Sequence, residues 1–75
     1  MKVHVIVRDD GSNAEIHRGD HHTAVEPQRG DRLLHVVIDG YHAPVVEQRE
    51  HDLAGASPFL RVRCRATRRS DGGEA

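Results

Sequence analysis

Two stretches of the chain alternate apolar and polar side chains in the way that half-buried strands do. Near the N-terminus, Val3, Val5 and Val7 alternate with polar residues, and Ile6 adds an apolar side chain on the second face. Near the C-terminus, residues 60–67 show the clearest alternation with a period of two. The even positions are apolar, at Leu60, Val62, Cys64 and Ala66, and the odd positions are polar. We therefore predict a strand at each place.

The residues from Asp9 to Asn13 predict a tight turn. They read Asp-Asp-Gly-Ser-Asn, and glycine accepts the positive φ that tight turns need. The chain is therefore expected to return through residues 14–17 as a second, short strand that completes a hairpin.

The tripeptide Arg-Gly-Asp occurs twice, at residues 18–20 and 29–31. Glycine tolerates unusual backbone angles and aspartate bonds to nearby backbone, so both residues favour turns. An adhesion signal would require export, and the apolar run at the N-terminus ends at Val7, too early for a signal peptide or a membrane span. We therefore predict two turns and no adhesion role.

Three further strands are predicted in the middle of the chain. Residues 22–26 leave room for one strand between the two turns. Residues 32–39 form the most hydrophobic run and carry apolar side chains on both parities, as does a central strand covered on two sides. Residues 41–50 predict another strand, with an edge or a bulge at Pro44 because proline cannot donate to a ladder. The small residues 54–58 predict a loop.

This pattern predicts an all-β fold, a small antiparallel barrel of five to six strands. The barrel is expected to span residues 1–67, and the polar residues 68–75 are expected to form a disordered, flexible tail. A closed sheet is favoured because it leaves no exposed strand edge, and the sequence shows no long amphipathic helix that could cover one.

The turns of the middle segment resemble those of a known family. Pro27-x-x-Gly30-Asp31 is followed by Asp39-Gly40 and then by Val45-Val46. This layout is similar to that of short bacterial and phage SH3-like β-barrel proteins, over about residues 27–66. The resemblance implies a barrel with a binding role and names no ligand.

Length and composition limit how the fold can be stabilised. A chain of 75 residues has room for one domain with a small core, and aromatic residues make up only 3% of it. The single cysteine, Cys64, cannot form an internal disulfide, so the aliphatic side chains must hold the fold. A reducing cytoplasm is the expected location.

Catalytic chemistry is not predicted. Ser12, Ser57 and Cys64 stand in no recognisable nucleophile motif, and no phosphate-binding or zinc-protease motif occurs. Cys64 lies on the apolar parity of its strand, which predicts a small core residue. A barrel of this size is also expected to lack a hollow of several hundred cubic ångströms. We therefore predict a protein that is not an enzyme and needs no cofactor.

The last strand carries a row of cations that could bind a partner. Arginines occupy every second position of this strand and continue beyond it, at Arg61, Arg63, Arg65, Arg68 and Arg69. The first three, spaced by about 6.6 to 6.8 Å, could follow a phosphate backbone or bind an acidic protein. They could instead pair across strands with Glu47 and Glu50.

Protein binding is the leading functional hypothesis, because mixed charge and few aromatic residues suit a polar protein contact. Binding of RNA or DNA is the alternative, although Tyr41 and Phe59 are the only aromatic rings for base stacking. Self-association is a further possibility, through an edge near Pro44 or through residues 2–8.

The histidines raise a third hypothesis, a metal- or pH-responsive module. Seven are present, and His17, His21 and His22 lie close together in the sequence. Zinc or nickel needs three or four N, O or S ligands around one point. His21 and His22 would point to opposite faces of a strand, so all three could join one site only in a loop.

Overall fold

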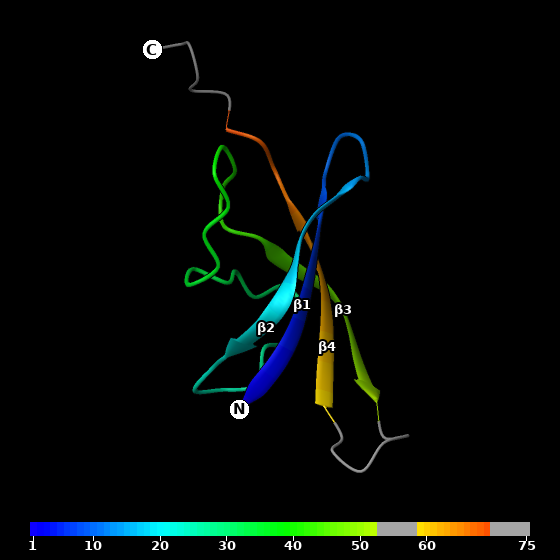
Figure 1. The fold of residues 1–75 in the computed structure, drawn as a ribbon, viewed down its shortest axis with the longest axis vertical. Helices are drawn as coiled ribbons and strands as arrows, with labels where there is room; N and C mark the ends of the chain where they lie inside the picture. Colours follow the sequence, from blue (N-terminus) through cyan, green and yellow to red (C-terminus); the bar gives the residue numbers. More distant parts are fainter. Residues whose placement is uncertain (53–58, 70–75) are drawn as a thin grey trace.

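The computed structural model describes residues 1–52 and 59–69, which form one four-stranded sheet (Figure 1). The strands are β1 (Lys2–Asp9), β2 (Glu15–His22), β3 (Val45–Asp52) and β4 (Phe59–Ala66), in the spatial order β2-β1-β4-β3. The described chain is therefore all-β, as predicted. Within the described ranges, no helix is long and apolar enough to cross a membrane.

The sheet consists of two antiparallel hairpins that meet along their inner strands. β1 pairs with β2 and β4 pairs with β3, both antiparallel, while β1 and β4 run parallel to each other. The end of β2 must therefore reach the start of β3 at the opposite edge of the sheet, which no tight turn can do. Residues 23–44 make this crossing, and we call them the connection (green in Figure 1).

The hydrophobic core lies between one face of the sheet, the core face, and the connection. The alternation read from the sequence holds in both inner strands, and the connection adds two aliphatic side chains of its own. Each core residue is at most 5% exposed: Val3, Val5, Val7, Val46, Leu60, Val62, Cys64, Ala66, Leu33 and Val36. Burying one valine or leucine contributes roughly 1.5–3 kcal/mol, so this single layer supplies most of the driving force.

The connection replaces the strand predicted for residues 32–39, and that prediction is wrong. The chain turns at residues 34–35 and again at 39–40, where Gly40 has a φ of 83°. Leu33 and Val36 consequently face the core, whereas Leu34 and Val37 are 75% and 84% exposed. Apolar side chains on both parities fit a strand covered on two sides, but they fit a turning segment that lies across a sheet equally well.

The other predictions for the middle of the chain hold in part. The short strand predicted for residues 14–17 begins at Glu15 and is longer than expected: it continues to His22, because β1 offers a pairing edge along its whole length. The turn predicted at the first Arg-Gly-Asp is therefore wrong, because this tripeptide lies inside a strand with Gly19 paired to Val5. The strand predicted for residues 22–26 is also wrong, since His22 ends β2 and residues 23–26 form no strand. The second copy does form a turn, in which the amide of Asp31 donates to the carbonyl of Gln28 at 2.9 Å.

The described sheet has four strands, is mixed and is open, so the prediction of a closed antiparallel barrel of five to six strands is wrong. The connection covers the core as a layer of its own, which removes the need for the sheet to curl. β1 has a partner on both sides and cannot pair with a second copy. β3 is an edge strand after Pro44, as predicted, but the backbone of residues 30–31 bonds to Val46 there.

The end of β4 is joined to the last turn of the connection. Arg68 forms a β-bridge with Tyr41, and the amide of Arg69 donates to the carbonyl of Gly40 at 2.9 Å. The loop predicted for residues 54–58 lies outside the described residues, as do residues 70–75 of the predicted tail.

Asp9 closes the predicted hairpin turn between β1 and β2. The amide and the hydroxyl of Ser12 donate to its carboxylate at 2.7 and 2.9 Å, and the residue is 6% exposed. The positive φ of this turn, 65°, belongs to Asn13 and not to the glycine. Hydrogen bonds from the Ser12 backbone and from the Tyr41 side chain lower the pKa of Asp9 to about 2.

The low pKa of Asp9 predicts an acid-sensitive contribution to stability. A carboxylate whose pKa is lowered by folding stabilises the folded state at pH values above its ordinary pKa of 3.8. This stabilisation is lost as the pH falls toward 2. Asp9→Asn should lower the melting temperature by several degrees at pH 7. The difference from the wild type should shrink between about pH 4 and pH 2. Asp10→Asn, at the neighbouring exposed position, is the control. If the melting temperatures of Asp9→Asn and the wild type differed by the same amount at every pH, this role of Asp9 would be contradicted.

Candidate functional site

Three of the five predicted arginines lie side by side on the sheet face opposite the core, which we call the arginine face. Arg61, Arg63 and Arg65 alternate in β4 with the buried residues of the core face. Their side chains are 30%, 34% and 37% exposed, so each is partly covered by its neighbours. The predicted row of cations is therefore present, at half-buried positions.

The glutamates of β3 neutralise this row. Glu50 lies between Arg61 and Arg63, with its Oε1 at 3.6 and 3.4 Å from their side-chain nitrogens. Nε of Arg65 donates to Glu47, at the irregularity in the β3–β4 pairing. The pairing with Glu47 and Glu50 that the sequence suggested is thus confirmed. The arginine face carries both signs of charge in close contact.

Apolar atoms lie beneath and beside the charges. Ile6 points to the arginine face but is only 3% exposed, and its neighbours in register are Arg18 and Arg63. The aliphatic stems of such arginines can cover an apolar side chain while the guanidinium stays in water. Arg61 also lies over the ring of Phe59, with 5.3 Å from its guanidinium carbon to the ring centroid. These arginines therefore also have a structural role.

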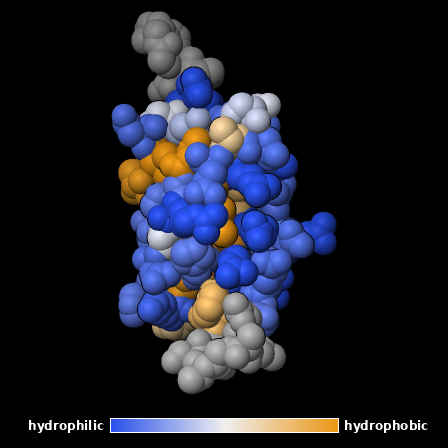
Figure 2. All heavy atoms as spheres, turned by 45° about the vertical axis from the view of Figure 1, so that its right-hand side comes forward, coloured by the Kyte–Doolittle hydropathy of each residue, from blue (hydrophilic) through white to orange (hydrophobic). Residues whose placement is uncertain are grey.

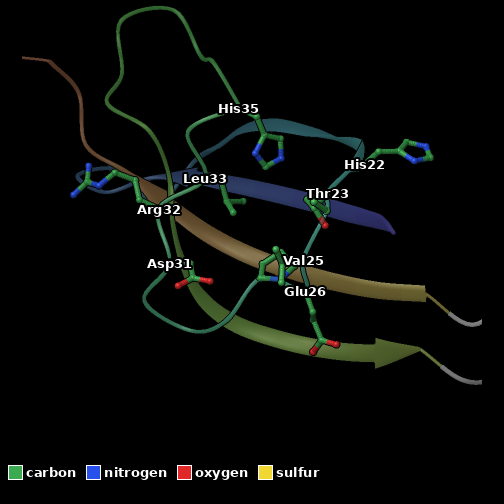
Figure 3. A pocket seen from close by; sticks show the side chains of 10 residues that line it. His22, Thr23, Val25, Glu26, Asp31, Arg32, Leu33 and His35 are labelled. Atoms are coloured by element: carbon green, nitrogen blue, oxygen red, sulfur yellow. The ribbon is translucent and has the colours of Figure 1, made fainter.

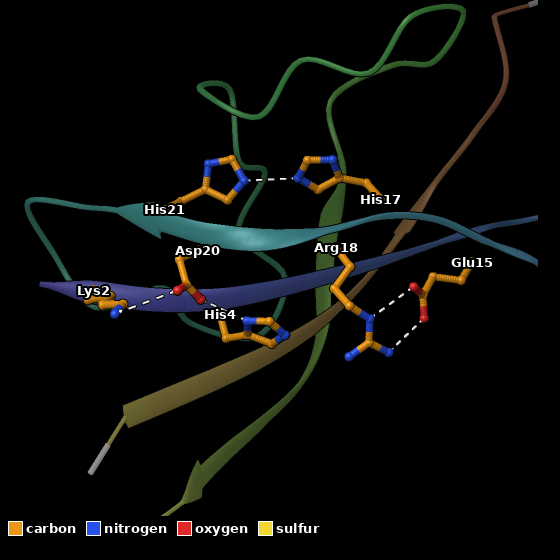
Figure 4. Close-up of polar contacts among 7 residues, drawn as sticks. All are labelled: Lys2, His4, Glu15, His17, Arg18, Asp20 and His21. Atoms are coloured by element: carbon orange, nitrogen blue, oxygen red, sulfur yellow. Dashed lines mark hydrogen bonds and ion pairs between the residues drawn. The ribbon is translucent and has the colours of Figure 1, made fainter. Parts of the chain in front are cut away.

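The β1–β2 half of the arginine face is paired as well. Nδ1 of His4 lies 2.8 Å from the carboxylate of Asp20, and the Lys2 amine lies 3.6 Å from it (Figure 4). The hydrogen bond from His4 lowers the pKa of Asp20. Arg18 forms two hydrogen bonds with Glu15 in the same strand. Charge alternation therefore extends across the whole face.

Arg68 and Arg69 lie beyond the end of β4, apart from this row. Nη2 of Arg68 lies 3.2 Å from the hydroxyl of Tyr41, and the guanidinium lies over that ring at 5.5 Å. The structure thus brings Arg61, Arg63 and Arg65 together and places the other two at the turn near residue 40.

The predicted histidines divide between the two sides of β2. His17 and His21 lie on the core side with their Nε2 atoms 2.9 Å apart, while His22 is exposed and has the parity of Asp20 (Figure 4). Sequence reasoning missed His35, whose ring lies beside that of His21. Burial, together with the charges of His17 and His35, lowers the pKa of His21. Among residues 1–52 and 59–69, no group of three or more His, Cys, Asp or Glu side chains lies so that it could hold a metal ion.

A hollow of about 480 Å³ lies between the end of β2 and the connection (Figure 3). Its wall includes Thr23, Glu26, Leu33 and His35. The expectation that a domain of this size lacks a hollow of several hundred cubic ångströms is therefore wrong. All of its lining residues except His22 belong to the connection, so the hollow lies mainly between two stretches of that segment.

The face of the molecule drawn in Figure 2 is largely hydrophilic, and its main apolar patch lies toward one end. In the described part of the chain, the large apolar side chains that are exposed are Met1, Val25, Leu34 and Val37. Three of these four belong to the connection. The exposed apolar area therefore lies mainly on that segment, away from the arginine face.

No protein-family model, curated protein or solved structure matches this chain. The resemblance to SH3-like barrel proteins therefore stays a prediction.

Proposed function

We propose that this chain is a small, non-enzymatic binding module of the cytoplasm, and that its arginine face contacts a protein partner. The observation that carries the proposal is the pairing of Arg61 and Arg63 with one carboxylate, that of Glu50. A surface with alternating charges held in fixed positions favours a partner with a complementary pattern of both signs. Phe59, at the end of the same row, adds an aromatic contact of the kind enriched in protein interfaces.

Nucleic-acid binding is the weaker alternative for the same face. A phosphate that approached Arg63 or Arg65 would also approach the carboxylates of Glu50 and Glu47, which repel it. Single-strand binders usually stack several bases on aromatic side chains, and this chain has only Tyr41 and Phe59. Mixed charge and few rings therefore both favour a protein partner.

The environment of the one thiol supports a role without catalysis. Cys64 is 2% exposed in the core, and burial raises the pKa of its thiol to about 12. A nucleophilic cysteine needs an accessible thiolate. The interpretation of Cys64 as a small core residue is confirmed.

The proposal is tested by comparing two matched pairs of substitutions in a cross-linking experiment with native cell extract. Arg63→Gln with Arg65→Gln removes two charges from the arginine face, and glutamine keeps part of the aliphatic stem of Arg63 beside Ile6. Arg29→Gln with Arg32→Gln removes two charges from exposed positions of the connection. The first pair should reduce the yield of the cross-linked partner protein at least about tenfold, since paired interface arginines are frequent hot spots. The second pair should leave the yield unchanged.

Oligonucleotide binding at 50 and 200 mM salt separates the two functions. The wild type should bind mixed oligonucleotides weakly or not at all at either concentration. Oligonucleotide binding that weakens steeply between 50 and 200 mM salt, and that is lost in the variant with Arg63→Gln and Arg65→Gln, would contradict protein binding and support the alternative. An equal yield of the cross-linked partner protein with the two double variants would also contradict the proposal.

A further inference from the structure

β2 is an edge strand, and its outer side has no backbone partner in the described part of the chain. Within residues 1–52 and 59–69, β1 lies on one side of β2, and no backbone hydrogen bond from the connection reaches the other side. The opposite edge of the sheet differs, because Gly30 and Asp31 bond to the backbone of Val46 there. An edge without a partner can pair with an extended strand from another chain.

The hydrogen bonds between β1 and β2 fix which residues of β2 point their backbone groups outward. Met1 and Thr23, at the end of this ladder, exchange two hydrogen bonds of 2.8 and 2.9 Å. In an antiparallel ladder such bonded pairs recur at every second residue, so the odd-numbered residues from 17 to 21 also bond to β1. The amide and carbonyl groups of Arg18 and Asp20 therefore point to the open edge.

The charges at this edge are arranged symmetrically about Gly19. Arg18 and Asp20 lie on the same side of β2, and their side chains are 52% and 50% exposed (Figure 4). If a second copy pairs antiparallel with Gly19 on the two-fold axis, Arg18 of each copy lies opposite Asp20 of the other, which stabilises the pairing. A shift of two residues in either direction would place Arg18 opposite Arg18, or Asp20 opposite Asp20. The charges therefore select one register.

The contacts within one copy leave room for this pairing. Arg18 bonds to Glu15 through Nε and Nη2, so Nη1 can donate to a second carboxylate. Asp20 accepts from His4, and a carboxylate has lone pairs for several donors. Gly19 would face its own copy across the axis, where two strands approach to about 4.5 Å between Cα atoms. Charges on an edge usually keep copies apart, but here their order is self-complementary.

We propose that two copies of the chain associate by antiparallel pairing of their β2 edges about Gly19, with Arg18 of each copy opposite Asp20 of the other. The two sheets then form one continuous sheet. This edge takes the place of the edges near Pro44 and at residues 2–8 that the sequence suggested for self-association. It does not involve the arginines of β4, so it is independent of the proposed contact with a partner protein.

Sedimentation equilibrium of the full-length protein at neutral pH tests the pairing, with two charge-reversal variants measured alone and mixed. The wild type should form a dimer with a dissociation constant in the micromolar range. Arg18→Asp and Asp20→Arg should each weaken the dimer at least about tenfold, because each brings like charges together. An equimolar mixture of the two variants should dimerise nearly as well as the wild type, since their charges are again complementary across the axis. Arg29→Asp, at an exposed position of the connection, is the matched control and should dimerise like the wild type.

A measurement on the wild type keeps the test valid if a variant fails to fold. In the proposed register, the Hα atoms of His17 in one copy and His21 in the other face each other. Within one copy these residues are about 13 Å apart along the strand, too far for an NOE between the same atoms. This NOE should therefore appear and grow with protein concentration. A protein that stays monomeric at millimolar concentration would overturn the proposal. So would a dimer without this NOE, or a mixture of the two folded variants that associates no better than each variant alone.

Discussion

Replacing Val36 with aspartate is expected to unfold the protein, whereas the same replacement at Val37 is expected to leave it folded. The two residues are neighbours in the connection, but Val36 is 1% exposed and Val37 is 84% exposed. A carboxylate at Val36 would lie unpaired in the core beneath the sheet, at a cost of several kcal/mol. A domain of 75 residues has a total stability of only about 4–11 kcal/mol, so this cost removes most or all of it.

Circular dichroism and thermal melting of Val36→Asp and Val37→Asp check this expectation. Val37→Asp should melt within a few degrees of the wild type, because exposed substitutions usually change stability by less than about 0.5 kcal/mol. If residues 32–39 were instead a strand covered on two sides, both variants would unfold. An unfolded Val37→Asp protein would therefore contradict the structure of the connection.

The thiol of Cys64 is expected to react with a small disulfide reagent about a thousandfold more slowly in the native protein than in the unfolded chain. Burial raises its pKa from the ordinary value of 9.0 to about 12, which lowers the thiolate fraction at neutral pH by about three orders of magnitude. The residue is also only 2% exposed, so the reagent can reach the thiol only after local or global unfolding. Both effects act in the same direction.

The labelling rate should be measured at pH 7.5 with and without urea. Val37→Cys in a Cys64→Ser background provides the matched control, because it places the one thiol at an exposed position of the same domain. That control should react at nearly the same rate with and without urea. Rapid labelling of native Cys64 would contradict its place in the core.

The two inner strands could be predicted because their alternation of apolar and polar residues fits only a half-buried strand. Val3 to Val7 and Leu60 to Ala66 alternate with a period of two, and this alternation matches the burial in β1 and β4. The parallel pairing of these strands could not be predicted, since it depends on the path of residues 23–44. That segment has apolar side chains on both parities and lacks a glycine at the turn of residues 34–35, so nothing local distinguishes it from a strand.

The candidate site was predictable to a similar extent. Arg61, Arg63 and Arg65 share a face because they share a parity, and Glu47 and Glu50 meet them because their strand is adjacent in the sequence. The contact of His21 with His35 joins segments with no common pattern, so only the packing of the connection on the sheet reveals it. Local periodicity predicts faces, whereas contacts between distant segments follow from the topology.

The fold depends on the parallel pairing of β1 with β4, and backbone NOEs in the NMR spectrum of the full chain test this pairing most directly. The structure predicts parallel cross-strand contacts with Val5 opposite Val62 and Val7 opposite Cys64. It also predicts that residues 33–40 give no continuous ladder of contacts with a strand. Antiparallel contacts between β1 and β4, or a regular ladder along residues 33–40, would contradict the fold and the sites built on it.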